Sequence, residues 1–191
     1  MGRRVAIGGT IAVVIVFAAA VFFVKRGLPT FGRQPASKAA AAAPAVPAPP
    51  GRKIKARLFY VADDGARLTS VERDVAYGDS PDDQAREIIA AQVAPVIEPL
   101  VSAIPPGTTL RAVFITKSGD AYVDLSREAR AAHPGGTVNE LLTVYTIVNA
   151  LTVNLPAVSR VQVLVDGKAV ETLSGHVDLR RPLAKNLAWV Q

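Results

Sequence analysis

The chain has 191 residues, with 22 lysines and arginines against 16 aspartates and glutamates, and it contains no cysteine. The absence of cysteine excludes disulfides, thiol nucleophiles, Cys-ligated metals and an N-terminal lipid on a lipobox cysteine. The net charge of +6 could indicate a nucleic-acid partner, but residues 1–53 carry eight basic and no acidic side chains, whereas residues 54–191 are slightly acidic. We therefore expect one globular domain with appendages and no binding of nucleic acid.

An uncharged apolar run, Val5 to Val24, lies between Arg3–Arg4 and Lys25–Arg26. At about 1.5 Å per residue, a helix of this length spans roughly 30 Å, the thickness of the membrane hydrocarbon core. We predict that residues 1–26 are a single-pass anchor in the cytoplasmic (inner) membrane, with Val5–Val24 in contact with lipid and the C-terminal domain on the extracytoplasmic, periplasmic side. The alternative is a signal peptide cleaved near Ala18–Ala20. Both interpretations export the rest of the chain.

Residues 27–53 are rich in proline and alanine and lack the apolar periodicity of a core, so we predict a disordered linker. The folded domain then occupies residues 54–191. It begins with a predicted hairpin, in which strands Lys55–Ala62 and Leu68–Ala76 flank the turn Asp63-Asp64-Gly65. The two aspartates are interpreted as turn residues, because a calcium loop needs a longer series of oxygen ligands.

A helix is predicted from Ser80 to about Ala94. Ser80 is a favourable N-cap, and Pro95 cannot continue the hydrogen-bond ladder of a helix. The apolar residues between them repeat with helical spacing and predict one buried face. A second hairpin joins Leu110–Thr116 to Ala121–Leu125.

A second helix is predicted from Thr137. The sequence Thr137-Val138-Asn139-Glu140 has the pattern of a capping box, in which two side chains bond backbone N–H groups at the helix start. Its wide apolar arc, which begins at Val138, predicts the better buried of the two helices. Asn149 lies in this arc, and a buried amide needs hydrogen-bond partners. We expect it to bind the backbone of Ile104–Thr108 or of Gly175–Leu179, and a contact with a ligand is the alternative.

A third hairpin joins Arg160–Val165 to Lys168–Leu173 through Asp166-Gly167, a favoured type I′ sequence. The tail carries the sole tryptophan, Trp189, which either packs back on the sheet or lies in a frayed end. Three hairpins and two helices predict an α+β fold of the order ββ-α-ββ-α-ββ. We expect a mostly antiparallel sheet with both helices packed on one face, preceded by one transmembrane helix.

His176 and Asp178 are the nearest approach to a reactive pair in the chain. A Ser-His-Asp site would need a nucleophile on a suitable turn, and a metal site would need more ligands than His133, the second histidine, could add. We therefore predict no catalytic residue, no cofactor and no metal. Four residues are candidates for structural or interaction roles: Asn149, Gly175, His176 and Asp178.

Four blocks of the sequence belong together: Ile104–Thr108, Tyr122–Ser126, Tyr145 with Val148–Asn149 and Leu151–Thr152, and Gly175–Leu179 before Pro182. These blocks resemble the GerMN domain, the sporulation and spore-germination domain family. The resemblance spans most of Leu58–Pro182 and implies an extracytoplasmic module with a fold related to ring-building modules of envelope assemblies. The chain has one copy where the sporulation member has two, an apolar anchor where that member has a lipid, and no clean Gly-Pro turn after the first helix.

From these features we expect a non-enzymatic module of the cell envelope that associates with a protein partner or with itself. Two alternatives stay open. One is a module that binds peptidoglycan or another small ligand through Gly175–Leu179. The other is a hydrolase that uses His176 and Asp178.

Overall fold

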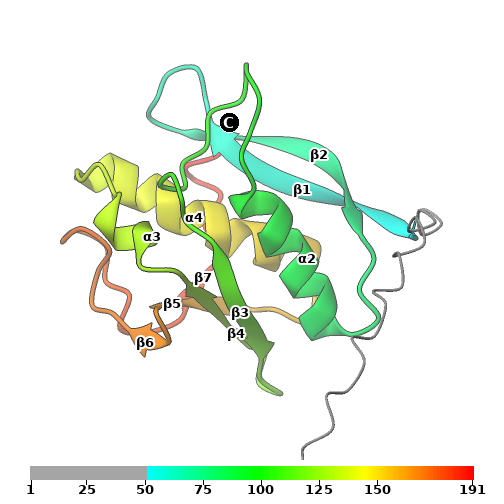
Figure 1. Ribbon diagram of the computed structural model, residues 1–191. Coiled ribbons are helices and arrows are strands. Elements are labelled where there is room, and N and C mark those ends of the chain that lie inside the picture. Colours follow the sequence, from blue (N-terminus) through cyan, green and yellow to red (C-terminus); the bar gives the residue numbers. More distant parts are fainter. Residues whose placement is uncertain (1–50) are drawn as a thin grey trace, which may run out of the picture. The chain divides into compact units, whose positions relative to one another are not determined.

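The structure, a computed structural model, describes residues 51–191 (Figure 1). The predicted membrane segment Val5–Val24, the alternative cleavage site Ala18–Ala20 and nearly all of the linker lie outside the described residues. In the part that is described, no helix is both long enough and apolar enough to cross a membrane. The elements in chain order are β1 (Lys53–Val61), β2 (Leu68–Ala76), α2 (Pro81–Val93), β3 (Leu110–Ile115), β4 (Asp120–Leu125), α3 (Glu128–Ala131), α4 (Thr137–Asn154), β5 (Arg160–Val165), β6 (Lys168–Ala169) and β7 (Leu183–Ala184).

The strands form two separate sheets instead of the single predicted one. β1 and β2 make an antiparallel hairpin, and the second sheet has the order β3-β4-β5-β6, with β7 also paired to β5. Helix α4 contacts β1 and β5, and helix α2 contacts β2 and β3, so the two helices connect the sheets (Figure 1). The α+β class is confirmed, whereas the prediction of one sheet with both helices on one face is wrong.

The edge of β1 that faces away from β2 is closed by side-chain amides from both helices. Gln92 of α2 accepts the N–H of Phe59 at 2.9 Å and donates to the Phe59 carbonyl at 2.8 Å. Asn154 of α4 makes the same pair of bonds with Arg57, both at 2.8 Å. Because these backbone groups are already satisfied, no further strand pairs with this part of β1, and the hairpin stays a sheet of its own.

The second sheet is mixed, because β4 and β5 run parallel, with Asp120 opposite Arg160 and Leu125 opposite Val165. The expectation of mostly antiparallel pairing is confirmed, since the other pairings between the described strands are antiparallel, but this central pair departs from it. Parallel neighbours need a crossover that returns the chain to the starting end of the first strand, and α3 with α4 supplies it. β3 pairs antiparallel with β4, as the predicted second hairpin requires.

The third hairpin turns at Asp166-Gly167 as predicted, with positive φ values of 49° and 74° at the two residues. Its second strand is shorter than the predicted Lys168–Leu173, because β6 ends at Ala169. The chain leaves the sheet there, since a buried carboxylate on α4 binds the backbone that follows. β7 pairs with the other end of β5.

Helix α2 agrees with its prediction. The Ser80 hydroxyl accepts the N–H of Asp83 at 3.1 Å, and the helix ends at Val93 with Ala94 as its C-cap. Apolar side chains of both helices and both sheets form one core cluster, which includes Leu58, Ile88, Val123, Leu151 and Val163.

Helix α4 begins at Thr137 as predicted, but it has no capping box. Its N-cap is Gly136, at a φ of 86°, and no side chain caps the N–H groups of the first turn. Glu140, the expected second member of the box, is fully buried. The prediction that α4 is the better buried helix is confirmed, although Val138 at its start is 42% exposed.

The C-terminal tail packs back on the first hairpin. The N–H of Leu68 donates to the Trp189 carbonyl at 2.7 Å, and the N–H of Gln191 donates to the Leu68 carbonyl at 2.9 Å. Of the two expectations for Trp189, the packed tail is confirmed and the frayed end is wrong, although the tail reaches β2 rather than the larger sheet.

Candidate functional site

Glu140 is the acceptor of a buried polar network. Its carboxylate is fully buried and accepts the N–H of Leu173 at 2.7 Å, the N–H of His176 at 2.8 Å and the hydroxyl of Ser174 at 2.9 Å. Burial raises the pKa of the Glu140 carboxyl, but the hydrogen bonds from residues 173–176 lower it by more, and the resulting pKa is about 2. The carboxylate is therefore ionised at neutral pH and ties residues 173–176 to α4.

His176 and Asp178 have different partners. His176 Nδ1 lies 3.2 Å from a carboxylate oxygen of Glu140. Asp178 accepts hydrogen bonds from the Arg180 side chain at 2.9 and 2.8 Å, and the guanidinium lowers the pKa of the Asp178 carboxyl. Gly175, at a φ of 101°, bends the chain between Ser174 and His176. The segment is bent rather than extended, and the structure does not bring His176 and Asp178 together as a reactive pair.

Asn149 is fully buried and binds the backbone of the C-terminal tail. Its amide donates to the Asn186 carbonyl at 2.8 Å and accepts the Asn186 N–H at 3.1 Å. Both expected partners, Ile104–Thr108 and Gly175–Leu179, are therefore wrong. The amide needs backbone partners as predicted, but it finds them in a part of the chain that the sequence pattern did not connect with α4.

His133 belongs to a second network that sequence reasoning missed. Its Nδ1 accepts the N–H of Gly135 at 3.0 Å, and its Nε2 lies 3.3 Å from the hydroxyl of Thr143. The same hydroxyl donates to the Ala103 carbonyl at 2.6 Å. Burial lowers the pKa of His133 below its ordinary value.

A signal for Glu140 was present in the sequence. Counted along α4, it precedes Val144, Ile147 and Leu151 by four, seven and eleven residues, so it shares their face of the helix. All of these side chains are buried. A carboxylate on a buried stripe has to be paired or hydrogen-bonded, and this reasoning favours a distant acceptor site over a cap.

The docking loop, as we call residues Ala94–Thr109 between α2 and β3, exposes apolar side chains. Glu98 is its one charged residue, and Ile97 and Val101 are 84% and 57% exposed. The loop is nevertheless attached to the domain, because the N–H of Val61 donates to the Val101 carbonyl at 2.8 Å.

Two hollows border the docking loop. One, of about 490 Å³, has a largely apolar lining that includes Val93, Pro95, Ile104 and Pro106. The other, of about 210 Å³, lies between the loop and the start of α4, and its lining includes Val61, Val101, Pro134 and Leu142. The surface around the loop therefore has depressions into which the side chains of a partner could pack.

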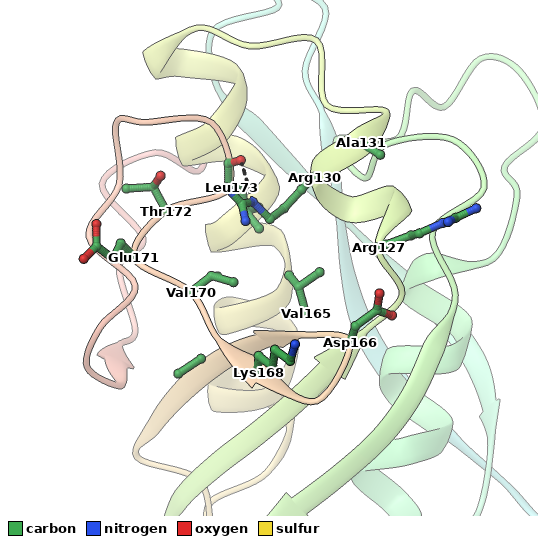
Figure 2. Close-up of a pocket in the computed structure, with 11 residues that line it drawn as sticks. Arg127, Arg130, Ala131, Val165, Asp166, Lys168, Val170, Glu171, Thr172 and Leu173 are labelled. Carbon is green, nitrogen blue, oxygen red and sulfur yellow. Dashed lines mark hydrogen bonds between the residues drawn. The ribbon is translucent and has the colours of Figure 1, made fainter.

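A wider open cleft, of about 770 Å³, lies on another part of the domain between α3 and the chain around β6 (Figure 2). Its lining is mixed. Val165 and Val170 contribute apolar surface. The charged lining residues are three basic ones, Arg127, Arg130 and Lys168, and two acidic ones, Asp166 and Glu171. Arg130 also donates to the Leu173 carbonyl at 3.3 Å, so this wall of the cleft adjoins the residues that Glu140 holds.

Within residues 51–191, no group of three or more His, Asp or Glu side chains is arranged to hold a metal ion. The polar side chains described above, such as Glu140, His176 and Asn149, form hydrogen bonds within the domain. The arrangement is suited to presenting fixed surfaces: an apolar loop on one part of the domain and a mixed, partly cationic cleft on another.

Comparison with known proteins gives one family match and several similar structures. Residues 57–171 match the family model described as Germane, sporulation and spore germination. The first GerMN domain of the sporulation protein GerM from Bacillus subtilis is similar in structure, with 18% identity, a TM-score of 0.53, and coverage of 69% of this chain and 97% of that one. The tandem GerMN domains of GerM give 16% identity, a TM-score of 0.51, and coverage of 71% and 46%.

A putative lipoprotein from Clostridium perfringens is 23% identical, with a TM-score of 0.48 and coverage of 70% of this chain and 88% of that one. No curated protein matches the chain. The matches to solved GerMN domains show the fold, and the family match covers more than half of the sequence, including Glu140, Asn149 and the docking loop. The chain therefore belongs to the sporulation and spore germination family and is a GerMN-domain protein.

Proposed function

We propose that this GerMN-domain protein is a non-enzymatic module of the cell envelope that binds a protein partner through the docking loop. The observation that carries the proposal is the exposure of Ile97 and Val101 on a loop with a single charged residue. Covering one such side chain contributes about 2 kcal/mol to binding. The partner we expect has a largely apolar surface without anionic groups, because an anion placed against this loop would lose its water without gaining an ion pair. Glu98 is the one loop residue that could pair with a cation of the partner.

The attachment of the loop supports this role. The loop is held at two carbonyls: Val101 accepts the N–H of Val61, and Ala103 accepts the hydroxyl of Thr143. A surface that is ordered before binding loses less conformational entropy when a partner binds than a free loop of the same composition. The hollows beside the loop provide depressions into which apolar side chains of the partner can pack.

The proposal also includes the predicted placement in the cell. The uncharged run Val5–Val24 between basic flanks supports a single-pass anchor in the cytoplasmic membrane. Residues 27–53 would then tether the domain on the extracytoplasmic side. A reporter enzyme that is active only after export, fused after Gln191, should be active, and a fusion that is active only in the cytoplasm would contradict this placement.

Site-specific crosslinking in cells tests the docking loop. A photoreactive residue at Ile97 of the full chain should give one defined crosslinked protein, either a partner or a second copy of the chain. The matched control is the same residue at Asp63, which is exposed on the turn between β1 and β2. An adduct that forms equally well from both positions, or from neither, would overturn the proposal. A Val101→Asp substitution should abolish the adduct from Ile97.

A second candidate function is recognition of an anionic cell-wall ligand, and the cleft in Figure 2 is the observation that favours it. Arg130 and Lys168 on its walls would attract a carboxylate or phosphate group. The full chain in detergent should co-sediment with purified peptidoglycan, and Lys168→Glu should weaken the association. Sedimentation no greater than that of an unrelated domain would remove this candidate.

A further inference from the structure

His133 connects three parts of the chain: the link between α3 and α4, helix α4 itself, and the docking loop. The Gly135 N–H bonds the Nδ1 side of the ring, and the Thr143 hydroxyl lies at the Nε2 side. Thr143 then reaches the carbonyl of Ala103 in the loop at 2.6 Å, and its hydroxyl is also 2.9 Å from the carbonyl of Asn139. A change at the ring is therefore two hydrogen bonds away from the loop.

The arrangement requires a neutral imidazole ring. Nδ1 must keep its lone pair to accept the N–H of Gly135, so the single ring hydrogen is on Nε2. The Nε2–H group then donates to the Thr143 oxygen, and the one hydrogen of that hydroxyl can go to Ala103. A second proton, on Nδ1, would point at the N–H of Gly135 and replace a hydrogen bond by a contact between two donors.

We propose that His133 is a pH-sensitive latch that holds the link into α4 in place while its ring is neutral and releases this link when the ring is protonated. The Nε2–H group still donates to Thr143 after protonation, so the docking loop stays tied to α4 at Ala103. Pro134 in the link lines the hollow of about 210 Å³ beside the loop, so release of the link changes that hollow. This adds a regulation to the proposed function and depends on that function for its biological meaning. The latch itself is a property of the chain without any partner, so the two proposals can fail separately.

Two titratable groups act on the ring, one from α4 and one from the segment after β6. Burial disfavours the charged ring, Glu140 on α4 favours it, and His176 from the segment after β6 disfavours it. The Arg130 side chain on α3 bonds the Leu173 carbonyl instead. Burial prevails, and the pKa of His133 is below 6.5, its value in an unfolded chain.

The sign of the pH effect follows from this shift. Because the folded pKa is lower than the unfolded one, the contribution of the neutral ring is complete above 6.5 and is lost as the pH falls from 6.5 through the folded pKa. Opening of the latch should increase by up to about tenfold per pH unit in that window. Glu140, with a pKa of about 2, stays ionised throughout.

Hydrogen–deuterium exchange of the full chain in detergent tests the latch. Between about pH 7.5 and about pH 5, after correction for intrinsic exchange rates, the peptide that contains Gly135 should lose protection, whereas peptides that contain Ala103 or β4 should not. In His133→Asn, whose amide can still accept the N–H of Gly135 but does not titrate, the pH dependence should disappear. The matched control is His176→Asn, which should keep it.

Thr143→Val separates the two ends of the latch. The peptide with Gly135 should respond to pH as before, and the loop peptide should exchange rapidly at both pH values. Unchanged protection in the unmodified chain, or a pH dependence that persists in His133→Asn, would overturn the proposal. Loss of protection without a specific crosslink from Ile97 would leave the latch standing and refute the proposed docking role.

Discussion

The first turns of α2 and α4 use their polar side chains in opposite ways. At α2, Ser80 binds the N–H of Asp83, three residues away. At α4, Glu140 binds backbone groups 33 and 36 residues away, and the first turn itself has no side-chain cap. The start of α2 is therefore a local structure, whereas the start of α4 is also part of the attachment of the C-terminal segment.

Removing the carboxylate of Glu140 should have the largest effect. Glu140→Ala leaves two backbone N–H groups and the Ser174 hydroxyl without their acceptor, and the loss of a buried charged partner costs about 3–5 kcal/mol. Denaturant unfolding measures the change. The matched control is Glu87→Ala on the partly exposed side of α2, with an expected cost of about 0.5 kcal/mol. Equal costs for the two variants would show that the two helix starts do not differ as described.

Acid should destabilise the domain through the same carboxylate, but by less, because a protonated Glu140 keeps oxygens that can still accept hydrogen bonds. Its pKa is about 2 in the fold and 4.5 in an unfolded chain. The stabilisation is thus complete above pH 4.5 and is lost as the pH falls from 4.5 towards 2. The melting temperature should decline in this window, and the decline should be shallower in Glu140→Gln. A variant with an identical acid profile would rule out Glu140 as the titrating group.

Breaking the link between α4 and the C-terminal tail should have an effect of intermediate size. Asn149→Leu leaves the N–H and carbonyl of Asn186 unpaired, at a cost of about 1–3 kcal/mol. Since Trp189 is the sole tryptophan, release of the tail should shift its fluorescence to longer wavelength. Lys185→Ala in the same tail is the control, because Lys185 is exposed and Asn149 binds the backbone of Asn186. A shift in the control as large as in Asn149→Leu would contradict this account.

The local cap should have the smallest effect. Ser80→Ala removes two hydrogen bonds at the start of α2, one from the N–H of Asp83 and one to its exposed carboxylate. It should cost about 1 kcal/mol in unfolding free energy. Combined with Glu140→Ala, its cost should add within about 0.5 kcal/mol, because the two sites share no partner. A larger coupling energy would mean that the two helix starts are not independent.

The contrast between the local cap of α2 and the long-range contacts at the start of α4 explains what could be predicted from the sequence. Ser80, Pro95 and the Asp166-Gly167 turn act on neighbouring residues, so the bounds of α2 and all three hairpin turns could be located. The parallel pairing of β4 and β5 depends on where α4 returns the chain, which no local signal encodes. The sequence around Thr137 and Glu140 has the spacing of a capping box, and only the burial of that helix face distinguishes a cap from a long-range anchor.

The candidate site was predictable in part for the same reason. Asn149 was identified as an amide that needs backbone partners, but its partner, Asn186, lies in a tail without a strong pattern. His176 and Asp178 were singled out by residue type, and their partners, Glu140 and Arg180, became visible only in three dimensions. The exposure of Ile97 could not be predicted from apolar composition, since Ile104 in the same loop is buried.

The amides of Gln92 and Asn154 on the outer edge of β1 affect how the domain would pair with other polypeptides. Each side chain presents a carbonyl and an N–H as a peptide group does, and so occupies hydrogen-bonding positions that a neighbouring strand would otherwise use. A foreign strand could align with this edge only after both amides had been displaced together. The domain is thereby protected against aggregation along β1 without proline or a charged residue pointing inward, and the same protection would let copies of the domain be joined in tandem without exchanging this strand.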